Sequence, residues 1–91
     1  MPVRKGTVSG SVSTVSFNIP TEVISFYLTN KTNAEQIVQV YVAAPDGDTR
    51  ILDLAVVSGK VWTYDSPIIM AAGYYFIIVS SGEIDYYFNI T

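Results

Sequence analysis

The chain has 91 residues, enough for one domain, and a formal net charge of −3. Charged residues make up 14% of the sequence, against a usual share of about 25%, and the mean hydropathy is +0.34. The acidic balance and the scattered basic residues argue against nucleic-acid binding, which requires a basic stripe. A small domain with so few charges implies that partners cover part of its surface.

The sequence contains no cysteine and no histidine. Disulfides, thiolate or histidine metal sites, cysteine nucleophiles and Ser-His triads are therefore excluded, and we expect no enzyme activity, no cofactor and no metal. The N-terminal residues lack the apolar segment of a signal peptide. The longest apolar run, at 68–79, is shorter than the ~20 residues of a membrane helix. We therefore expect synthesis in the host cytoplasm and no membrane contact.

Residues 1–14 are small and mostly polar, and we expect a flexible or arm-like segment there. Within it, 7–13 alternates polar residues with valine or glycine, which also suits a weak edge strand. Clear strand alternation begins with Val15, Phe17 and Ile19 and stops at a proline. We therefore place a single domain at 15–91.

Alternating apolar and polar residues predict further strands, each bounded by turn-forming residues. The first four of them lie at 22–30, 36–43, 50–57 and 61–65. In the first, Ile24, Phe26 and Leu28 share the inward face. A Pro-Asp-Gly turn at 45–47 predicts a tight reversal between the second and the third.

The segment 66–80 contains two apolar runs separated by Ala-Ala-Gly. The second run, 74–79, consists of aromatic and β-branched residues, which favours a strand that is covered on both faces. A last alternating strand lies at 84–91. Turns recur every 8 to 14 residues or so, which predicts an all-β fold: a small antiparallel β-sandwich, jelly-roll-like, with about seven or eight strands.

Alternate residues of the 74–79 strand fill the core and leave Tyr75, Ile77 and Val79 on the opposite face. Tyr87 and Tyr41 face outward on two other strands. These five residues form the predicted oligomer interface, because exposed apolar patches and aromatic residues mark interfaces. The alternative is that the N-terminal segment covers this face within the chain. We favour the interface and expect a homo-oligomer, a trimer or higher.

Trp62 and Tyr64 lie at alternate positions of one predicted strand. Either these two residues or the Tyr86-Tyr87 pair would suit the sugar-stacking platform of a carbohydrate-binding β-sandwich module for host surface glycans. The alternative, which we favour, is that a thin sandwich uses these large rings in its core. The acidic turn at 46–48 is interpreted as a hairpin turn rather than a calcium loop, because it offers too few oxygen ligands.

The order of elements after residue 24 resembles that of small β-sandwich structural proteins of tailed bacteriophages. The matching segments are Leu28-Thr29-Asn30, Val38-Gln39-Val40-Tyr41-Val42, Ile51-Leu52-Asp53-Leu54, Val57-Ser58-Gly59-Lys60 and Ser66-Pro67-Ile68-Ile69-Met70-Ala71-Ala72-Gly73. The resemblance covers residues 24–91. It implies a non-enzymatic virion component: a capsid decoration, head-fibre, collar or tail accessory protein. It also implies contacts with other virion proteins, such as the major capsid protein.

Overall fold

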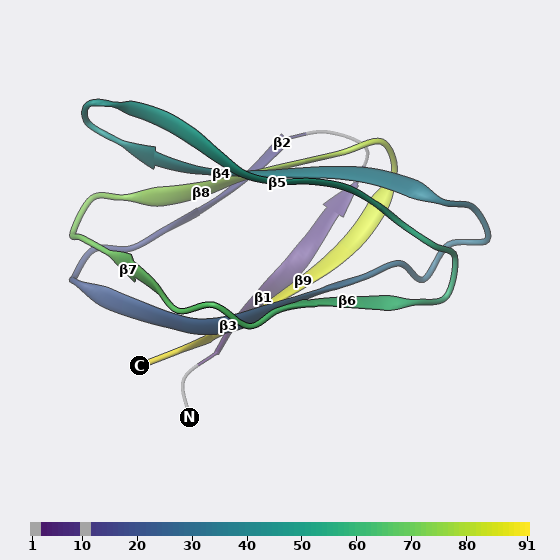
Figure 1. Cartoon of the computed structure of the whole chain (residues 1–91), viewed down its shortest axis with the longest axis horizontal. Helices are drawn as coiled ribbons and strands as arrows, with labels where there is room; N and C mark the ends of the chain where they lie inside the picture. Colours follow the sequence, from purple (N-terminus) through teal and green to yellow (C-terminus); the bar gives the residue numbers. More distant parts are fainter. Residues whose placement is uncertain (1–2, 10–11) are drawn as a thin grey trace.

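The computed structural model describes residues 3–9 and 12–91. In this part of the chain it contains nine strands and no helix, arranged as two antiparallel sheets that pack face to face (Figure 1). The predicted all-β sandwich is confirmed. The strands are β1 (Val3–Ser9), β2 (Val12–Ser16), β3 (Thr21–Thr29), β4 (Gln36–Ala44), β5 (Gly47–Val56), β6 (Val61–Tyr64), β7 (Ile68–Met70), β8 (Tyr75–Ser80) and β9 (Glu83–Ile90).

Each sheet combines strands that lie far apart in the sequence. The β9 sheet has the order β1-β9-β3-β6, with β7 also paired to β3, and the β8 sheet has the order β2-β8-β4-β5. The short strands β6 and β7 pair with opposite ends of β3, so together they occupy one position beside it. With β6 and β7 counted as one strand, each sheet has four strands and the connections are those of a jelly roll.

Phenylalanine rings from both sheets meet in the core. Phe76 of β8 stacks on Phe88 of β9, with 4.8 Å between ring centroids and 10° between ring planes. Phe26 of β3 lies 5.1 Å from Phe88 and 6.2 Å from Phe76. All three side chains are fully buried. The cluster therefore joins the two sheets through aromatic contacts, and such ring pairs add about 0.5–1.5 kcal/mol beyond area burial.

Strand alternation predicts the inward residues of β8 correctly, but Ile24 does not share the inward face of Phe26 and Leu28, and Ile19 does not share the burial of Val15 and Phe17. In the pairing of β3 with β9 the register shifts between Val23 and Ser25. This bulge inserts Ile24 as an extra residue, so Val23 takes the buried position instead. Ile19 is 69% exposed, because the pairing of β2 with β8 stops at Ser16 and the chain then turns towards the other sheet.

The N-terminal segment, expected to be flexible or arm-like, contributes β1 and most of β2. These strands pair with β9 and β8, so they form edges of the chain's own two sheets. Arg4 connects the two edges: its Nη1 donates to the carbonyl oxygen of Ser16 at 2.8 Å, and its guanidinium lies 5.4 Å from the ring centroid of Phe17. Residues 10–11 of the expected arm lie outside the described residues.

Asn30 is a fully buried polar side chain just after β3. Its Nδ2 donates to the carbonyl oxygens of Ala34 and Val56, each at 2.8 Å. Its Oδ1 accepts from the backbone N–H of Thr32 at 2.9 Å and from the Thr32 hydroxyl at 2.6 Å. The amide therefore ties the β3–β4 loop to the end of β5, which is how a buried polar group is normally satisfied.

Replacement of Asn30 by alanine should lower the free energy of unfolding by about 2–3 kcal/mol, because it leaves buried backbone groups without partners. Urea unfolding, followed by the fluorescence of Trp62, measures this loss. Asn33→Ala is the matched control, because Asn33 lies in the same loop but is exposed; it should change stability by less than about 0.5 kcal/mol. Equal stabilities of the two variants would contradict the structural role of Asn30.

Candidate functional site: two outer sheet faces

The outer face of the β8 sheet brings four of the five predicted interface residues together. Tyr75, Ile77 and Val79 occupy alternate positions of β8, and Tyr41 of β4 is the direct cross-strand partner of Ile77. Tyr75 is 37% exposed, and Ile37, further along β4, is 47% exposed. Ile77, Val79 and Tyr41 are half-buried. We give the name β8-face patch to Tyr41, Tyr75, Ile77, Val79 and Ile37, an aromatic and aliphatic surface in which Gln39, the cross-strand partner of Val79, is a polar interruption.

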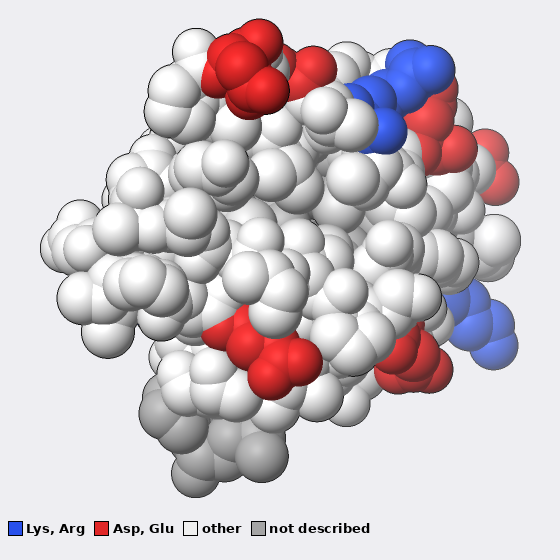
Figure 2. Space-filling model, turned by 60° about the vertical axis from the view of Figure 1, so that its left-hand side comes forward, with Lys and Arg blue, Asp and Glu red and all other residues white. Residues whose placement is uncertain are grey.

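The β8-face patch is almost free of charge. β2, β8 and β4 contain no charged residue, and charged side chains enter this face from β5, where Arg50 and Asp53 form an ion pair at 3.3 Å. Figure 2, which shows the sandwich from the side, has acidic and basic groups in separate places with uncharged surface between them. A partner can therefore cover the β8-face patch without burying an unpaired charge.

Tyr87 lies on the opposite side of the sandwich. It belongs to β9, between Lys5 of β1 and Tyr27 of β3. The grouping of Tyr87 with the other four predicted interface residues is therefore wrong. β8 and β9 follow each other in sequence, but in the jelly roll the turn between them carries the chain from one sheet to the other.

Trp62 and Tyr64 face the core. They lie across from Leu28 and Phe26 in the pairing of β6 with β3, and the ring of Tyr64 stacks on Phe26 at 4.9 Å and 14°. Both are half-buried and pack against the core cluster, as does Tyr86. This placement agrees with the favoured interpretation of Trp62 and Tyr64 as core aromatics. The two rings do not form the exposed pair that a sugar platform would need.

The outer face of the β9 sheet carries a set of side chains that the sequence analysis does not group. One row across β1, β9 and β3 holds Lys5, Tyr87 and Tyr27, in which the two tyrosine rings lie 5.8 Å apart. The next row, which extends to β6, holds Thr7, Asp85, Thr29 and Val61. Alternation shows that each of these residues points outward, but only the pairing of the strands brings them together.

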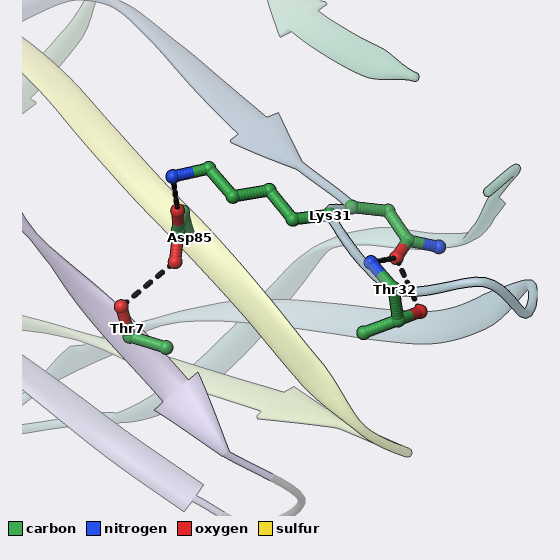
Figure 3. A network of polar contacts seen from close by, with 5 residues as sticks. Thr7, Lys31, Thr32 and Asp85 are labelled. Carbon is green, nitrogen blue, oxygen red and sulfur yellow. Dashed lines mark hydrogen bonds and ion pairs between the residues drawn. The ribbon is translucent and has the colours of Figure 1, made fainter. Parts of the chain in front are cut away.

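An ion pair with a hydrogen bond stands at one end of this face (Figure 3). The Lys31 ammonium, just beyond β3, reaches Asp85 Oδ2 at 2.7 Å, and the Thr7 hydroxyl donates to Asp85 Oδ1 at 2.7 Å. The hydrogen bonds from Lys31 and Thr7 hold the pKa of Asp85 below its ordinary value. The hydrogen bond and the charge of Asp85 raise the pKa of Lys31. The carboxylate is therefore fixed in place and ionised at neutral pH.

Two hollows flank Tyr87 on the same face. The larger, of about 520 Å³, is lined by Lys5, Gly6, Thr7, Thr29, Lys31, Asp85, Tyr86 and Tyr87. The other is lined by Tyr27, Thr29, Val61, Tyr87 and Asn89. They share Thr29 and Tyr87, so they form one uneven surface that combines aromatic rings with hydrogen-bonding groups.

In the described part of the chain, no three His, Cys, Asp or Glu side chains gather as metal ligands would. Among the same residues, no helix has the length and apolar character needed to span a membrane. The acidic turn at 46–48 includes the reversal between β4 and β5, where Gly47 adopts a φ of +133°. The structure of this turn therefore agrees with its interpretation as a hairpin turn.

No protein-family model matches the sequence, and no curated protein matches it. Among solved structures, the crystal structure of PirA is similar, with a TM-score of 0.58 and 14% identity over 96% of this chain and 93% of that one. A chain in the structure of the infectious bursal disease virus Gx strain has a TM-score of 0.48 and 8% identity; the match covers 97% of this chain and 33% of that one. At this level of identity, the likeness to PirA concerns the fold alone.

The ion pair on the β9 face gives stability a defined pH dependence. Because the pKa of Asp85 is lowered in the folded chain, its contribution is present at neutral pH and is lost as the pH falls through the folded pKa. The raised pKa of Lys31 adds a loss only in the strongly alkaline range. Asp85→Asn should therefore lower stability slightly at neutral pH and reduce the loss of stability on acidification by the same amount, which is small because solvent screens the ion pair.

Urea unfolding at about pH 7 and about pH 3 measures this difference. Asp53→Asn is the control, because it removes the Arg50–Asp53 ion pair on the other sheet and leaves the Lys31–Asp85 contact intact. If the free energy of unfolding of Asp85→Asn changes with pH as it does in the unmodified chain, then Lys31 and Thr7 do not stabilise the ionised Asp85 carboxylate.

Proposed function

We propose that this chain is a non-enzymatic structural protein of a tailed-phage virion that assembles as a homo-oligomer. The observation that carries the proposal is the β8-face patch, which spans two neighbouring strands of one sheet. Its place is in the particle, as a decoration, head-fibre, collar or tail accessory protein. There it contacts other virion proteins, such as the major capsid protein.

The β8-face patch favours a second copy of the chain as its partner. Tyr41 and Ile77 stand side by side across β4 and β8, and Tyr75 and Ile37 extend the same surface in two directions. Aromatic residues are enriched in the cores of interfaces, whereas charged residues are depleted there, and this face has both properties. A net charge of −3 on each copy opposes association, so contact through the β8-face patch, whose five residues carry no charge, keeps the repulsion low.

The virion role is supported by the sequence resemblance over residues 24–91, and the jelly-roll arrangement is compatible with it. Jelly rolls occur in viral capsid proteins, but also in lectins and other classes, so the fold alone does not fix the function. The absence of cysteine and histidine from the sequence supports a non-enzymatic role.

Mass spectrometry of purified phage particles whose genome encodes this chain tests the virion assignment. We expect the chain in the particles at a fixed copy number that is a multiple of the oligomer size, because closed homo-oligomers enter a particle as units. Absence of the chain from washed particles, with abundant chain in the lysate, would contradict a virion role. That result would leave the oligomer itself untouched.

Ile77→Asp should convert the oligomer to a monomer, because it places a charge in the middle of the β8-face patch. Size-exclusion chromatography with light scattering measures the mass. Val61→Asp is the matched control, since Val61 is 58% exposed on the outer face of the β9 sheet; it should keep the mass of the unmodified chain. An Ile77→Asp variant with an unchanged oligomeric mass would rule out assembly through this face.

A further inference from the structure

We propose that the outer face of the β9 sheet binds an uncharged oligosaccharide across the ring of Tyr87. This site is distinct from the β8-face patch, because the two lie on opposite outer faces of the sandwich. The inference does not depend on the virion role. It rests on four features of the β9 face: the exposed ring of Tyr87 beside the half-buried ring of Tyr27, groups that donate and groups that accept hydrogen bonds, the fixed positions of those groups, and the balance of charge.

The aromatic pair supplies the surface that a sugar ring needs. One face of many pyranose rings presents C–H groups, which pack against the apolar face of an aromatic side chain. Tyr87 is 38% exposed, and its ring lies 5.8 Å from that of Tyr27 at an angle of 34°. Val61, 58% exposed, adds an apolar wall to the smaller hollow. Tyr87 is the central element because it lines both hollows.

The polar groups match the hydroxyls of a sugar. Each hydroxyl both donates and accepts, so a saccharide site needs donors and acceptors within reach of the same ring. Lys31 supplies an ammonium and Asp85 a carboxylate on one side of Tyr87, and each retains hydrogen-bonding capacity beyond their mutual contact. On the other side, Asn89 donates through Nδ2 to Ser25 Oγ at 3.0 Å, which leaves its Oδ1 as an acceptor for a ligand.

These groups are held in place before any ligand arrives. Asp85 is fixed from two directions, by Lys31 and by the Thr7 hydroxyl (Figure 3). Tyr87, Asp85 and Asn89 occupy alternate positions of β9, a strand that is paired on both sides. A site built on paired strands loses little conformational entropy on binding, which favours affinity.

The size and the charge of the surface define the ligand class. The larger hollow measures about 520 Å³, within the range of about 300–1,000 Å³ for ligand sites. The hollow on the other side of Tyr87 makes room for a second sugar unit. Lys5 and Lys31 supply two positive charges at the larger hollow, and Asp85 and the nearby Glu83 supply two negative ones. This balance favours a neutral oligosaccharide over an acidic one.

The chain contains a close control for this site. Tyr75 is 37% exposed at the outer face of β8, which is second in its sheet as β9 is in the other. Its cross-strand neighbours are Ser16 and Ala43, so it lacks the ion pair and the second ring that accompany Tyr87. In the Ile77→Asp background, where assembly through the β8-face patch is already disrupted and no partner covers Tyr75, Tyr75→Ala and Tyr87→Ala therefore remove the same side chain at the same exposure, from surfaces of different chemistry.

Two-dimensional ¹H–¹⁵N NMR titrations test the inference, with maltohexaose, chitotetraose and a β-galactotetraose as neutral probes and a uronic-acid tetramer as the acidic one. We expect at least one neutral probe to shift the amide signals of residues that line the two hollows, among them Thr29, Asp85 and Tyr87. Tyr87→Ala should raise the dissociation constant about tenfold or more, because it removes the stacking surface. Measured in the Ile77→Asp background, where assembly is already disrupted, Tyr75→Ala should leave it unchanged.

Asp85→Asn is a second variant, because it keeps the shape of the side chain and loses carboxylate acceptor capacity; it should also weaken binding. Circular dichroism melts confirm that each variant is folded. The inference is overturned if no neutral probe shifts these signals at millimolar concentration, if the uronic-acid tetramer binds best, or if Tyr75→Ala weakens binding as much as Tyr87→Ala. Unchanged binding by Ile77→Asp would separate this site from the assembly face.

Discussion

The contact between the two sheets through Phe76, Phe88 and Phe26 is the constraint on which the remaining structure depends. A sandwich of about 90 residues has one thin core, so nearly every inward position must be filled by a large apolar side chain. The stack of Phe76 on Phe88 fixes how β8 and β9 face each other across the core. Once Phe76 and Phe88 are fixed as inward residues, strand alternation also fixes the outward residues of β8 and β9, and with them the centres of both candidate surfaces.

The two outer faces differ in chemistry although they belong to one small domain. On the β8 sheet, Ile77 and its neighbours form an aliphatic and aromatic surface with few hydrogen-bonding groups, which suits contact with another protein. On the β9 sheet, Tyr87 stands between an ion pair and an amide, which suits a ligand rich in hydroxyls. A sandwich can therefore assemble through one face and keep the other available, a division that needs no loop insertion or second domain.

The sequence predicts which residues of a strand share a face, but it does not predict which strands are neighbours. Alternation placed Phe76 in the core and Ile77 on the surface correctly, because the period of a strand is two everywhere. It placed Tyr87 with β8, because only the jelly-roll crossing shows that β9 belongs to the other sheet. It also missed Val23, because a bulge at Ile24 carries no clear signal in the sequence. The β9-face site depends on pairing, so it could not be predicted in the same way.

The most direct test of the central claim, that the β8 face is the assembly surface and the β9 face is not, is an isotope-filtered NOE measurement on a mixture of labelled and unlabelled chains. The account predicts intermolecular NOEs from the methyl groups of Ile37, Ile77 and Val79, and none from Val61. Intermolecular NOEs from Val61 alone, or a monomeric protein with none from either face, would contradict it.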